Sequence, residues 1–443
     1  MFGGLDAPSR PSSRLTSTAL YLGCGVLLFM LVAISSAGIP MLAIGAAAAL
    51  TIVLALGFER AGTLFMILAL FFSPMNIIRV VAGGASVTAS DGLFVGATIL
   101  LLPTLMSRRL KVPALYAAGA IGLLTMGIVA SVASTSPLLS LLLISKIVIA
   151  GLVMPIVFMW WGPNLKLISV MAAAYICGNV VSVAYSFVDP VQVFRSYGLT
   201  THVNNFGHAS LLSMALMPFV FRLLPRWTWA FQGIAAIACF WGIWSSGSRA
   251  ALLVLAVIIM LYPILERSGR VAWAGAFGAT ILVLFLSRIR GADDASALGR
   301  LLGGDASVNS DNQRRDQLRL GWSQFKEHPI SGRGFVDVIE FHNIYLAVAV
   351  AVGVLGLIAF LVMLWPAVHP LIFGSRPYGL IAYPAISYMG FGALATNLWD
   401  RFVWILIALI LATRMLDEAE DKDDEELGVE TSAPPLYMAS RSP

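Results

Sequence analysis

Charged residues are scarce in this sequence. Only 12% of its 443 residues are Asp, Glu, Lys or Arg, whereas 59% are hydrophobic. Soluble globular chains carry about 25% charged residues, so the composition excludes an ordinary soluble domain and predicts a polytopic membrane protein. The net charge of +5 is small, and the cytoplasmic loops of membrane proteins are enriched in Lys and Arg anyway. We therefore expect the lipid bilayer, and no nucleic acid, as a partner.

Cysteine and histidine are also scarce. The three cysteines, Cys24, Cys177 and Cys239, lie inside apolar runs without paired spacing, which is typical of small packing residues. No HExxH or CxxC motif is present, so we expect no bound metal and no cofactor. The first apolar run, residues 17–37, is long enough to span a bilayer and has no evident cleavage site, so it is not expected to be a removable secretory signal.

Long apolar runs dominate the chain instead. They lie at residues 17–37, 39–58, 62–72, 92–106, 112–133, 138–161, 167–188, 209–221, 227–244, 250–265, 271–286, 344–366, 380–394 and 402–415. A membrane-spanning helix needs about 20 residues, and several of these runs are shorter. Because only helices and closed barrels satisfy their backbone in lipid, we predict an all-α polytopic integral membrane protein with about 12 to 14 transmembrane helices.

The runs and the polar stretches between them divide the chain into five predicted parts. These are a cytoplasmic N-terminal arm (1–16), a first helix bundle (17–286), a long, partly helical periplasmic loop (287–341), a second set of transmembrane helices (342–415) and an acidic cytoplasmic tail (416–443). The tail is rich in Asp and Glu and poor in apolar residues. Such a composition predicts disorder.

The cations between the runs predict an orientation. If the N-terminus is inside, the cytoplasmic turns carry most of the cations: Arg60, Arg108, Arg109, Lys111, Lys166, Arg222, Arg226, Arg267, Arg270, Arg376 and Arg414. The opposite turns carry largely one arginine each: Arg79, Arg195, Arg249 and Arg401. Cytoplasmic loops are the more cationic ones, so both termini are predicted to be cytoplasmic and the loop 287–341 periplasmic.

The long loop should contain an amphipathic helix, at residues 313–327. Three good N-cap residues precede it: Asn309, Ser310 and Asp311. His328-Pro329 ends it, because a residue before proline disfavours the helical conformation. Three apolar residues share one stripe: Leu318, Trp322 and Phe325. We therefore expect the helix to lie with this stripe against the membrane domain.

Several cations could form a site at the predicted periplasmic face. Arg249 stands in SSGSRAALL, Arg314 and Arg315 flank the apolar stripe of the loop helix, and Arg195 and Lys146 lie near or inside apolar runs. Arg195 is followed by four further polar residues: His202, Asn204, Asn205 and His208. Ionisable residues at membrane depth usually face a cavity, although single cations can also extend to lipid headgroups. A guanidinium pairs two oxygens at once, so arginines on one side suit a pyrophosphate.

His342 adds a titratable base at the start of an apolar run. An unperturbed imidazole has a pKa near 6.5 and can accept a proton at neutral pH. A lone histidine is equally compatible with a structural, hydrogen-bonded role.

Three sequence blocks together resemble the bacterial O-antigen ligase and polysaccharide polymerase superfamily. The first is His342-Asn343 followed, after nine residues, by GVLG (353–356). The second is HPISGRG (328–334), which follows an arginine and a helix, and the third is SGSRAALL around Arg249. The motifs cover the C-terminal half of the chain, and the architecture is similar throughout.

The resemblance implies a metal-independent, inverting glycosyltransferase of the bacterial inner membrane, with its active site facing the periplasm. The donor would be a glycan on undecaprenyl pyrophosphate, and the acceptor a sugar hydroxyl of lipid A core or of a growing glycan. A protein acceptor, as in an O-oligosaccharyltransferase, remains open. His342 matches the family's base and Arg249 a phosphate-contacting arginine. The second family arginine fits Arg314 best, with Arg315 adjacent.

Six further residues are predicted to contact the donor or acceptor or to support residues that do. They are Arg195 and Lys146 for the donor pyrophosphate, and Asn343, Arg319, His208 and Arg333 around it. A transporter or flippase for a lipid-linked glycan is the competing class. Transporters commonly show internal repeats and paired broken helices, and no matching halves are visible here. A binding scaffold without chemistry would tolerate the loss of His342.

Overall fold

The structure, a computed structural model, describes residues 50–82, 85–188, 195–225, 228–266, 297–301, 308–336 and 338–426. The predicted apolar runs at 17–37 and 271–286, most of the run at 39–58, the N-terminal arm and the end of the tail lie outside these residues.

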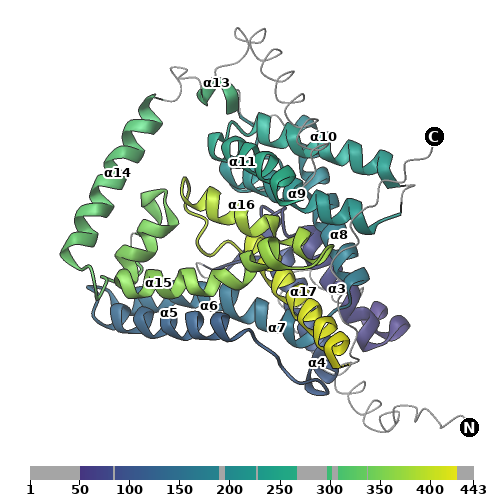
Figure 1. The fold of residues 1–443 in the computed structure, drawn as a ribbon. Helices are drawn as coiled ribbons and strands as arrows, with labels where there is room; N and C mark the ends of the chain where they lie inside the picture. The colour runs from purple at the N-terminus through teal and green to yellow at the C-terminus, as the bar shows by residue number, and fades with distance from the viewer. Residues whose placement is uncertain are drawn as a thin grey trace, which may run out of the picture. The chain divides into compact units, whose positions relative to one another are not determined.

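The described residues are almost entirely helical (Figure 1). The longer helices are α3 (Phe58–Phe72), α4 (Ala89–Met106), α5 (Ala114–Val132), α6 (Pro137–Val148), α7 (Met154–Trp161), α8 (Leu165–Val188), α9 (Val203–Leu223), α10 (Trp229–Ser245), α11 (Arg249–Leu265), α14 (Val308–Glu327), α15 (Ile344–Phe373), α16 (Tyr383–Gly392) and α17 (Arg401–Glu426). One short antiparallel hairpin, β1 (Arg79–Ala82) and β2 (Ala85–Thr88), was not part of the predicted fold class.

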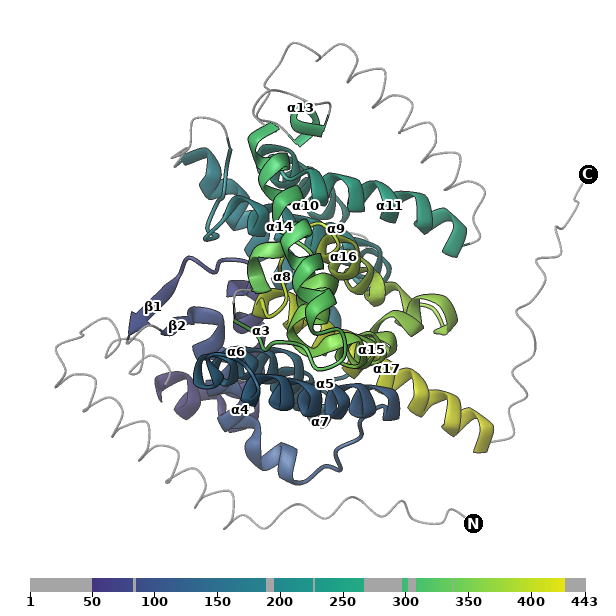
Figure 2. The same cartoon turned by 90° about the vertical axis from the view of Figure 1, so that its left-hand side faces the viewer.

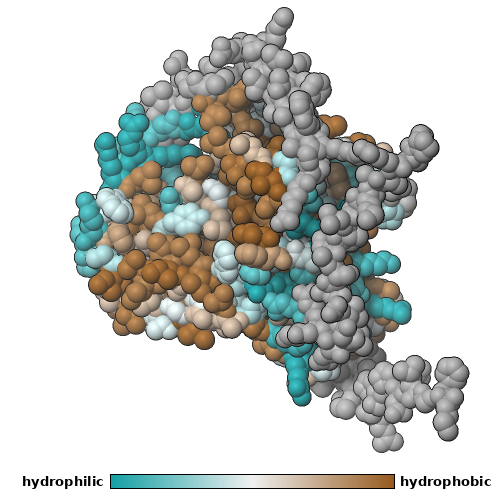
Figure 3. Space-filling model, viewed as in Figure 1, coloured by the Kyte–Doolittle hydropathy of each residue, from teal (hydrophilic) through white to brown (hydrophobic). Residues whose placement is uncertain are grey.

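Six of these elements are long and apolar enough to cross a membrane, which confirms a polytopic helical membrane protein. They are α4, α5, the continuous segment from α6 through the π-helical residues Ile149–Val153 to α7, α8, α9 and α15. The helices α10 and α11, of 17 residues each, are shorter. Figure 3 shows hydrophobic side chains in brown over the region of α15 and α5, and hydrophilic side chains along α14. The apolar run at 380–394, one of the runs shorter than a full span, contains the ten-residue helix α16, which begins at Tyr383 with Pro384 in its first turn.

The chain divides into two compact units. The first contains residues up to Ala69 and Asp91–Arg108, and within it α3 packs closely on α4: a Cβ at Gly62 would lie 2.8 Å from Leu101 Cγ. The second contains residues 70–90 and 109–443, and so every candidate site residue. Small residues allow helices to approach closely in membranes. In the second unit Gly119 of α5 has this role, because a Cβ there would lie 2.4 Å from Met363 N of α15.

The helix α15 is broken at Gly353, where φ is 72° and ψ is −178°. The segment 329–334 fills the break with backbone hydrogen bonds. Arg333 N donates to Val350 O (3.0 Å), Gly334 N donates to Ala351 O (3.0 Å), and Val354 N donates to Pro329 O (2.8 Å). Irregular backbone at membrane depth is tolerated only where protein groups satisfy it. The two glycine-containing blocks HPISGRG and GVLG therefore form one structure, which we call the clasp (residues 329–334 and 350–354).

We expect Gly353→Ala to destabilise the protein by more than about 1–3 kcal/mol, the cost of a non-glycine residue in a left-handed conformation. An added Cβ would also lie 2.0 Å from Ile330 O, a backbone atom that cannot rotate away. The matched control is Gly233→Ala on α10, where a Cβ meets nothing within 4 Å. Thermal unfolding in detergent measures both variants. An unchanged Tm for Gly353→Ala would contradict this account of the clasp.

The loop helix α14 begins at Val308 and ends at Glu327, and Figures 1 and 2 show it as one long helix. Its predicted end is confirmed, but its start is five residues earlier, so Asp311 lies in the first turn and is no cap. The predicted orientation was wrong, because Leu318 and Trp322 are 40% and 55% exposed. The polar side of α14 faces the rest of the protein instead. Gly321 on this side packs on Leu346 of α15, and Asp311 forms an ion pair with Arg249.

The acidic tail starts as a helix, whereas disorder was predicted from residue 416. The helix α17 continues through Glu426. Arg414 pairs with Glu418 at 2.7 Å, one helical turn away, and Ser375 donates a hydrogen bond to Asp417. Pairs of opposite charge four residues apart stabilise helices, which explains why the helix extends into the acidic sequence.

Candidate functional site

The turn between α10 and α11, residues 245–249, is the centre of the site. Ser245 O accepts a hydrogen bond from Ser196 N (2.9 Å), and Ser248 caps α11 by accepting from Ala251 N (3.4 Å). The turn needs Gly247, whose φ is 63°. The helix α9 lies close beneath, because a Cβ at Gly207 would be 2.6 Å from Ser246 Oγ. This packing fixes the direction of the carbonyl groups of the turn.

Two arginines from distant parts of the chain bind those carbonyls. Arg195 Nε donates to Ser246 O (2.7 Å), and its second donor reaches Asn204 Oδ1 (3.3 Å). Arg300, in the short helix α13 (Ala297–Leu301), donates to Gly247 O (3.0 Å) and is only 7% exposed. One turn of five residues therefore holds two guanidiniums beside a third, that of Arg249.

Arg249 forms a two-donor ion pair with Asp311 in the first turn of α14. One guanidinium nitrogen donates to Asp311 Oδ2 at 2.8 Å, and the other contacts Oδ1. The Arg249 side chain is 17% exposed and that of Asp311 is 39% exposed. A carboxylate has the geometry of a phosphate for a guanidinium fork, so Asp311 occupies the donors that a phosphate would use.

The electrostatics show that four arginines act on one another. The pKa of Arg195 is lowered by burial and by the charges of Arg300, Arg314 and Arg249. The pKa of Arg314 is lowered by burial and then by Arg249 and Arg300. The bond from Arg249 lowers the pKa of Asp311 below its usual range. The four guanidiniums and the Asp311 carboxylate together carry a net charge of +3. A ligand with several negative charges would relieve the repulsion between the guanidiniums.

Two histidines lie beside this arginine cluster (Arg195, Arg249, Arg300, Arg314). His342 stands between the 3-10 helix Val338–Phe341 and α15, in a left-handed conformation with φ 52°. Burial lowers the pKa of His342, and the charges of Arg314 and His202 lower it further. His202 caps α9: its Nδ1 accepts from Asn204 N (3.1 Å), so its Nε2 carries the proton in the neutral form. His342 is therefore a neutral imidazole at pH 7, able to accept a proton.

The structure brings four of the predicted site residues into one cluster: His342, Arg249, Arg314 and Arg195. It distinguishes Arg314 from its neighbour, because Arg314 is partly buried and its charge acts on both histidines, whereas Arg315 is exposed. The Arg319 side chain is also exposed, at 75%, with Asp316 at 3.8 Å.

Four other predicted residues lie elsewhere or have structural partners. The Lys146 ammonium lies 5.6 Å from the centre of the Trp399 ring. Arg333 belongs to the clasp through its backbone, and its side chain is exposed. Asn343 caps α15 by accepting from Leu346 N (2.9 Å) and donates to Ala393 O (3.1 Å). His208 is fully buried, stacked on Phe391 at 4.0 Å, with its Nδ1 2.8 Å from the Asn397 amide. Asn343 and His208 therefore have structural partners, and no contact among the described residues joins Lys146 or Arg333 to the cluster.

Sequence reasoning missed Arg300, and it treated Asp311 only as a helix cap. Arg300 stands in a stretch of Gly, Ala and Asp without any motif, so the sequence gives no signal for it. His202 was noted among the polar residues after Arg195, without a role. Within the residues that the structure describes, no three His, Cys, Asp or Glu side chains group in a way that could hold a metal ion. The positive charge of the cluster is carried by guanidiniums.

Residues 234–361 match the family model described as O-antigen ligase. The matched segment contains the 245–249 turn, Arg300, α14, the clasp and His342, which are most of the cluster and its supports. Arg195 and His202 precede it. No curated protein matches the chain.

Proposed function

Because residues 234–361 carry an O-antigen ligase domain, we propose that this membrane protein transfers a glycan from a polyprenyl pyrophosphate to a sugar hydroxyl. The observation that carries the proposal is the convergence of a neutral histidine, His342, with four arginines that have a single carboxylate among them. This arrangement supports a role for His342 as the base and for the arginines as the binding site of a strongly anionic leaving group.

The proposed reaction is one inverting displacement. The acceptor hydroxyl oxygen attacks the anomeric carbon, and His342 takes its proton. The bond from the anomeric carbon to the pyrophosphate oxygen breaks, and both electrons leave with that oxygen. A base on one face of the sugar and charge stabilisation on the other follow the inverting logic of glycoside chemistry. Because pyrophosphate leaves as an anion, guanidiniums can stabilise it without a general acid.

Among the arginines, Arg249 and Arg314 are proposed to contact the pyrophosphate directly. Asp311 would leave Arg249 when the donor binds, since both acceptors use the same two guanidinium donors. Arg195 and Arg300 would keep one donor each on the carbonyls of the 245–249 turn and contact phosphate oxygens with other guanidinium donors. Asn343 and His208 support this arrangement from α15 and α9.

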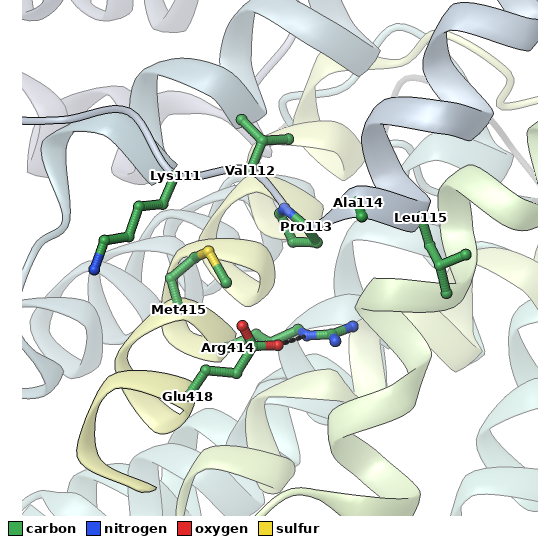
Figure 4. A pocket seen from close by; sticks show the side chains of 8 residues that line it. All are labelled: Lys111, Val112, Pro113, Ala114, Leu115, Arg414, Met415 and Glu418. Atoms are coloured by element: carbon green, nitrogen blue, oxygen red, sulfur yellow. Dashed lines mark hydrogen bonds and ion pairs between the residues drawn. The ribbon is translucent and has the colours of Figure 1, made fainter. Parts of the chain in front are cut away.

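Lys111 and Arg414 lie at the start of α5, at the opposite end of this helix from the clasp, and they support a periplasmic location of the site. The helix α5 starts at Ala114, three residues after Lys111, and ends near the clasp: a Cβ at Gly334 would lie 2.7 Å from the Cβ of Ser134, two residues after the end of α5. Its 19 residues span about 28 Å. A cavity of about 350 Å³ lies at the start of α5, and Figure 4 shows Lys111, Arg414 and Glu418 among the side chains that line it. By the positive-inside rule, we propose that this cationic end is cytoplasmic and that the arginine cluster faces the periplasm of a bacterial inner membrane.

The acceptor decides between three activities of this class. Transfer to lipid A core is ligation, transfer to another lipid-linked unit is polymerisation, and transfer to a protein hydroxyl is protein O-glycosylation. The cluster describes donor chemistry, which all three share. The described part of the periplasmic loop, chiefly α14, favours a glycan acceptor, because it is a single helix packed on α15 with no separate domain for docking a protein.

The test is glycan transfer by the purified full-length protein in liposomes. The assay supplies a polyprenyl-pyrophosphate-linked glycan and, in parallel, lipid A core, unmodified donor or a protein acceptor, each with and without EDTA. We expect transfer to a glycan acceptor that chelator does not reduce. A single added glycan would identify a ligase, and a ladder of products a polymerase. Movement of the donor between leaflets without transfer to any acceptor would overturn the proposal in favour of a transporter.

A further inference from the structure

An apolar groove of about 610 Å³ lies between α8 and α10. Each helix lines it with one stripe of residues spaced i, i+3, i+4 and i+7, from Val180 to Phe187 and from Ile234 to Trp241. The middle of each stripe is small, with Ala184 on α8 and Ala238 on α10. The lining contains no charged side chain, so the groove suits a hydrocarbon and neither a sugar nor a phosphate.

The groove leads to the arginine cluster. Both stripes end at the side of the helices where the cluster lies. Phe187 and Trp241 stack there, with ring centroids 5.6 Å apart and planes 16° from parallel. Trp241 is five residues before Ser246, whose carbonyl accepts from Arg195 Nε, a rise of about 7.5 Å along a helix. Aromatic residues gather at the headgroup level of membranes, so the stacked pair marks the level at which a lipid phosphate would sit.

We propose that this groove holds the first isoprene units of the donor's polyprenyl tail while the arginine cluster holds its pyrophosphate. The proposal rests on the proposed function, and it specifies where the lipid part of the donor binds. In this arrangement the phosphates lie at the 245–249 turn, where the arginines are, and the hydrocarbon lies along the uncharged helix α10 from Trp241 to Ile234.

The tether explains why the donor tail, and no other hydrocarbon, would occupy the groove. Lipid chains are as apolar as the groove, so transfer from the bilayer gains little hydrophobic free energy. A tail joined to a bound pyrophosphate is instead present at a high effective concentration within its reach. Phe187 and Ile237 are 63% and 73% exposed, so the groove is open along its side and a tail can enter laterally from the bilayer.

The first experiment labels the groove without any glycan transfer. The probe is a polyprenyl diphosphate with a diazirine in its tail near the phosphate, irradiated with the wild-type protein in detergent. We expect label on peptides containing residues 180–187 and 234–241, removed by excess unlabelled polyprenyl diphosphate. Label that lies only on other helices would overturn the proposal. Because the probe carries no sugar, the result does not depend on whether the protein proves to be a transferase.

The second experiment fills the groove. Ala184→Trp puts a large side chain at an exposed groove position, and Ala118→Trp does the same at an exposed position on α5, away from the groove. We expect Ala184→Trp to weaken binding of the full-length polyprenyl diphosphate about tenfold, which is 1.4 kcal/mol, and to leave inorganic diphosphate binding unchanged. Ala118→Trp should bind both as the wild type does.

Equal binding of the full-length probe by the two tryptophan variants, with equal Tm, would overturn the proposal. So would a cross-link between a cysteine at Phe187 and one placed in residues 271–286, because the groove would then be covered by another helix of the same chain. Loss of inorganic diphosphate binding in Ala184→Trp would also count against it, since the change would then act on the cluster and not on the tail.

Discussion

Replacing His342 with alanine is expected to lower the kcat of glycan transfer by about 10²- to 10⁴-fold, the usual contribution of a general base. The neutral imidazole lies beside Arg314 and His202 at the start of α15. The arginines proposed to bind the pyrophosphate stay in place, so the donor KM should change much less than kcat. Steady-state transfer with a saturating acceptor separates the two constants.

A control and a pH profile distinguish a base from a structural histidine. His369→Ala, which removes a histidine near the far end of α15, should keep wild-type kcat. Because burial and the charge of Arg314 lower the pKa of His342 from its usual 6.5, more than half of the imidazole is still neutral at pH 6.5, and the acid limb of kcat/KM should lie below that value. Arg314→Gln removes one cause of the lowering, so the acid limb should move to higher pH. A kcat for His342→Ala equal to that of His369→Ala would refute the assignment.

The sequence predicted the membrane class and most of the cluster, because both depend on local patterns. Apolar runs of spanning length can be recognised without any tertiary structure. Arg249 and His342 could be identified because each stands in a short sequence block that resembles the family. The clasp explains why two of these blocks contain glycine: Gly353 adopts a left-handed conformation against Ile330 O, a requirement that any sequence forming this backbone must meet.

The orientation of α14 and the place of Arg300 in the cluster could not be predicted, because both depend on contacts between distant parts of the chain. An apolar stripe normally predicts the buried side of a helix, but α14 turns its polar side inward because Asp311 pairs with Arg249, 62 residues away. Arg300 enters the cluster only because Gly247 O accepts its hydrogen bond. The ion pair with Arg249, and not the apolar stripe, therefore sets the orientation of α14.

Replacing Arg249 with alanine is expected to lower kcat/KM for the donor by about 10²- to 10³-fold, the loss seen when one preorganised donor to a developing anion is removed. The two-donor pair with Asp311 shows that the Arg249 fork is already held in a geometry that fits two oxygens. Arg249→Lys keeps the charge and loses the fork, so its activity should fall between those of the wild type and Arg249→Ala.

The matched control for Arg249 is Arg315→Ala, because Arg315 has the same charge, lies next to Arg314 and is exposed. Its kcat/KM should stay within about twofold of wild type, the small effect typical of exposed surface charges. The same assay also tests whether charge alone matters. If Arg315→Ala and Arg249→Ala lose activity equally, the arginines act as a diffuse positive field. A loss confined to Arg249→Ala, with wild-type Tm, would show that the geometry held by the 245–249 turn stabilises the leaving pyrophosphate.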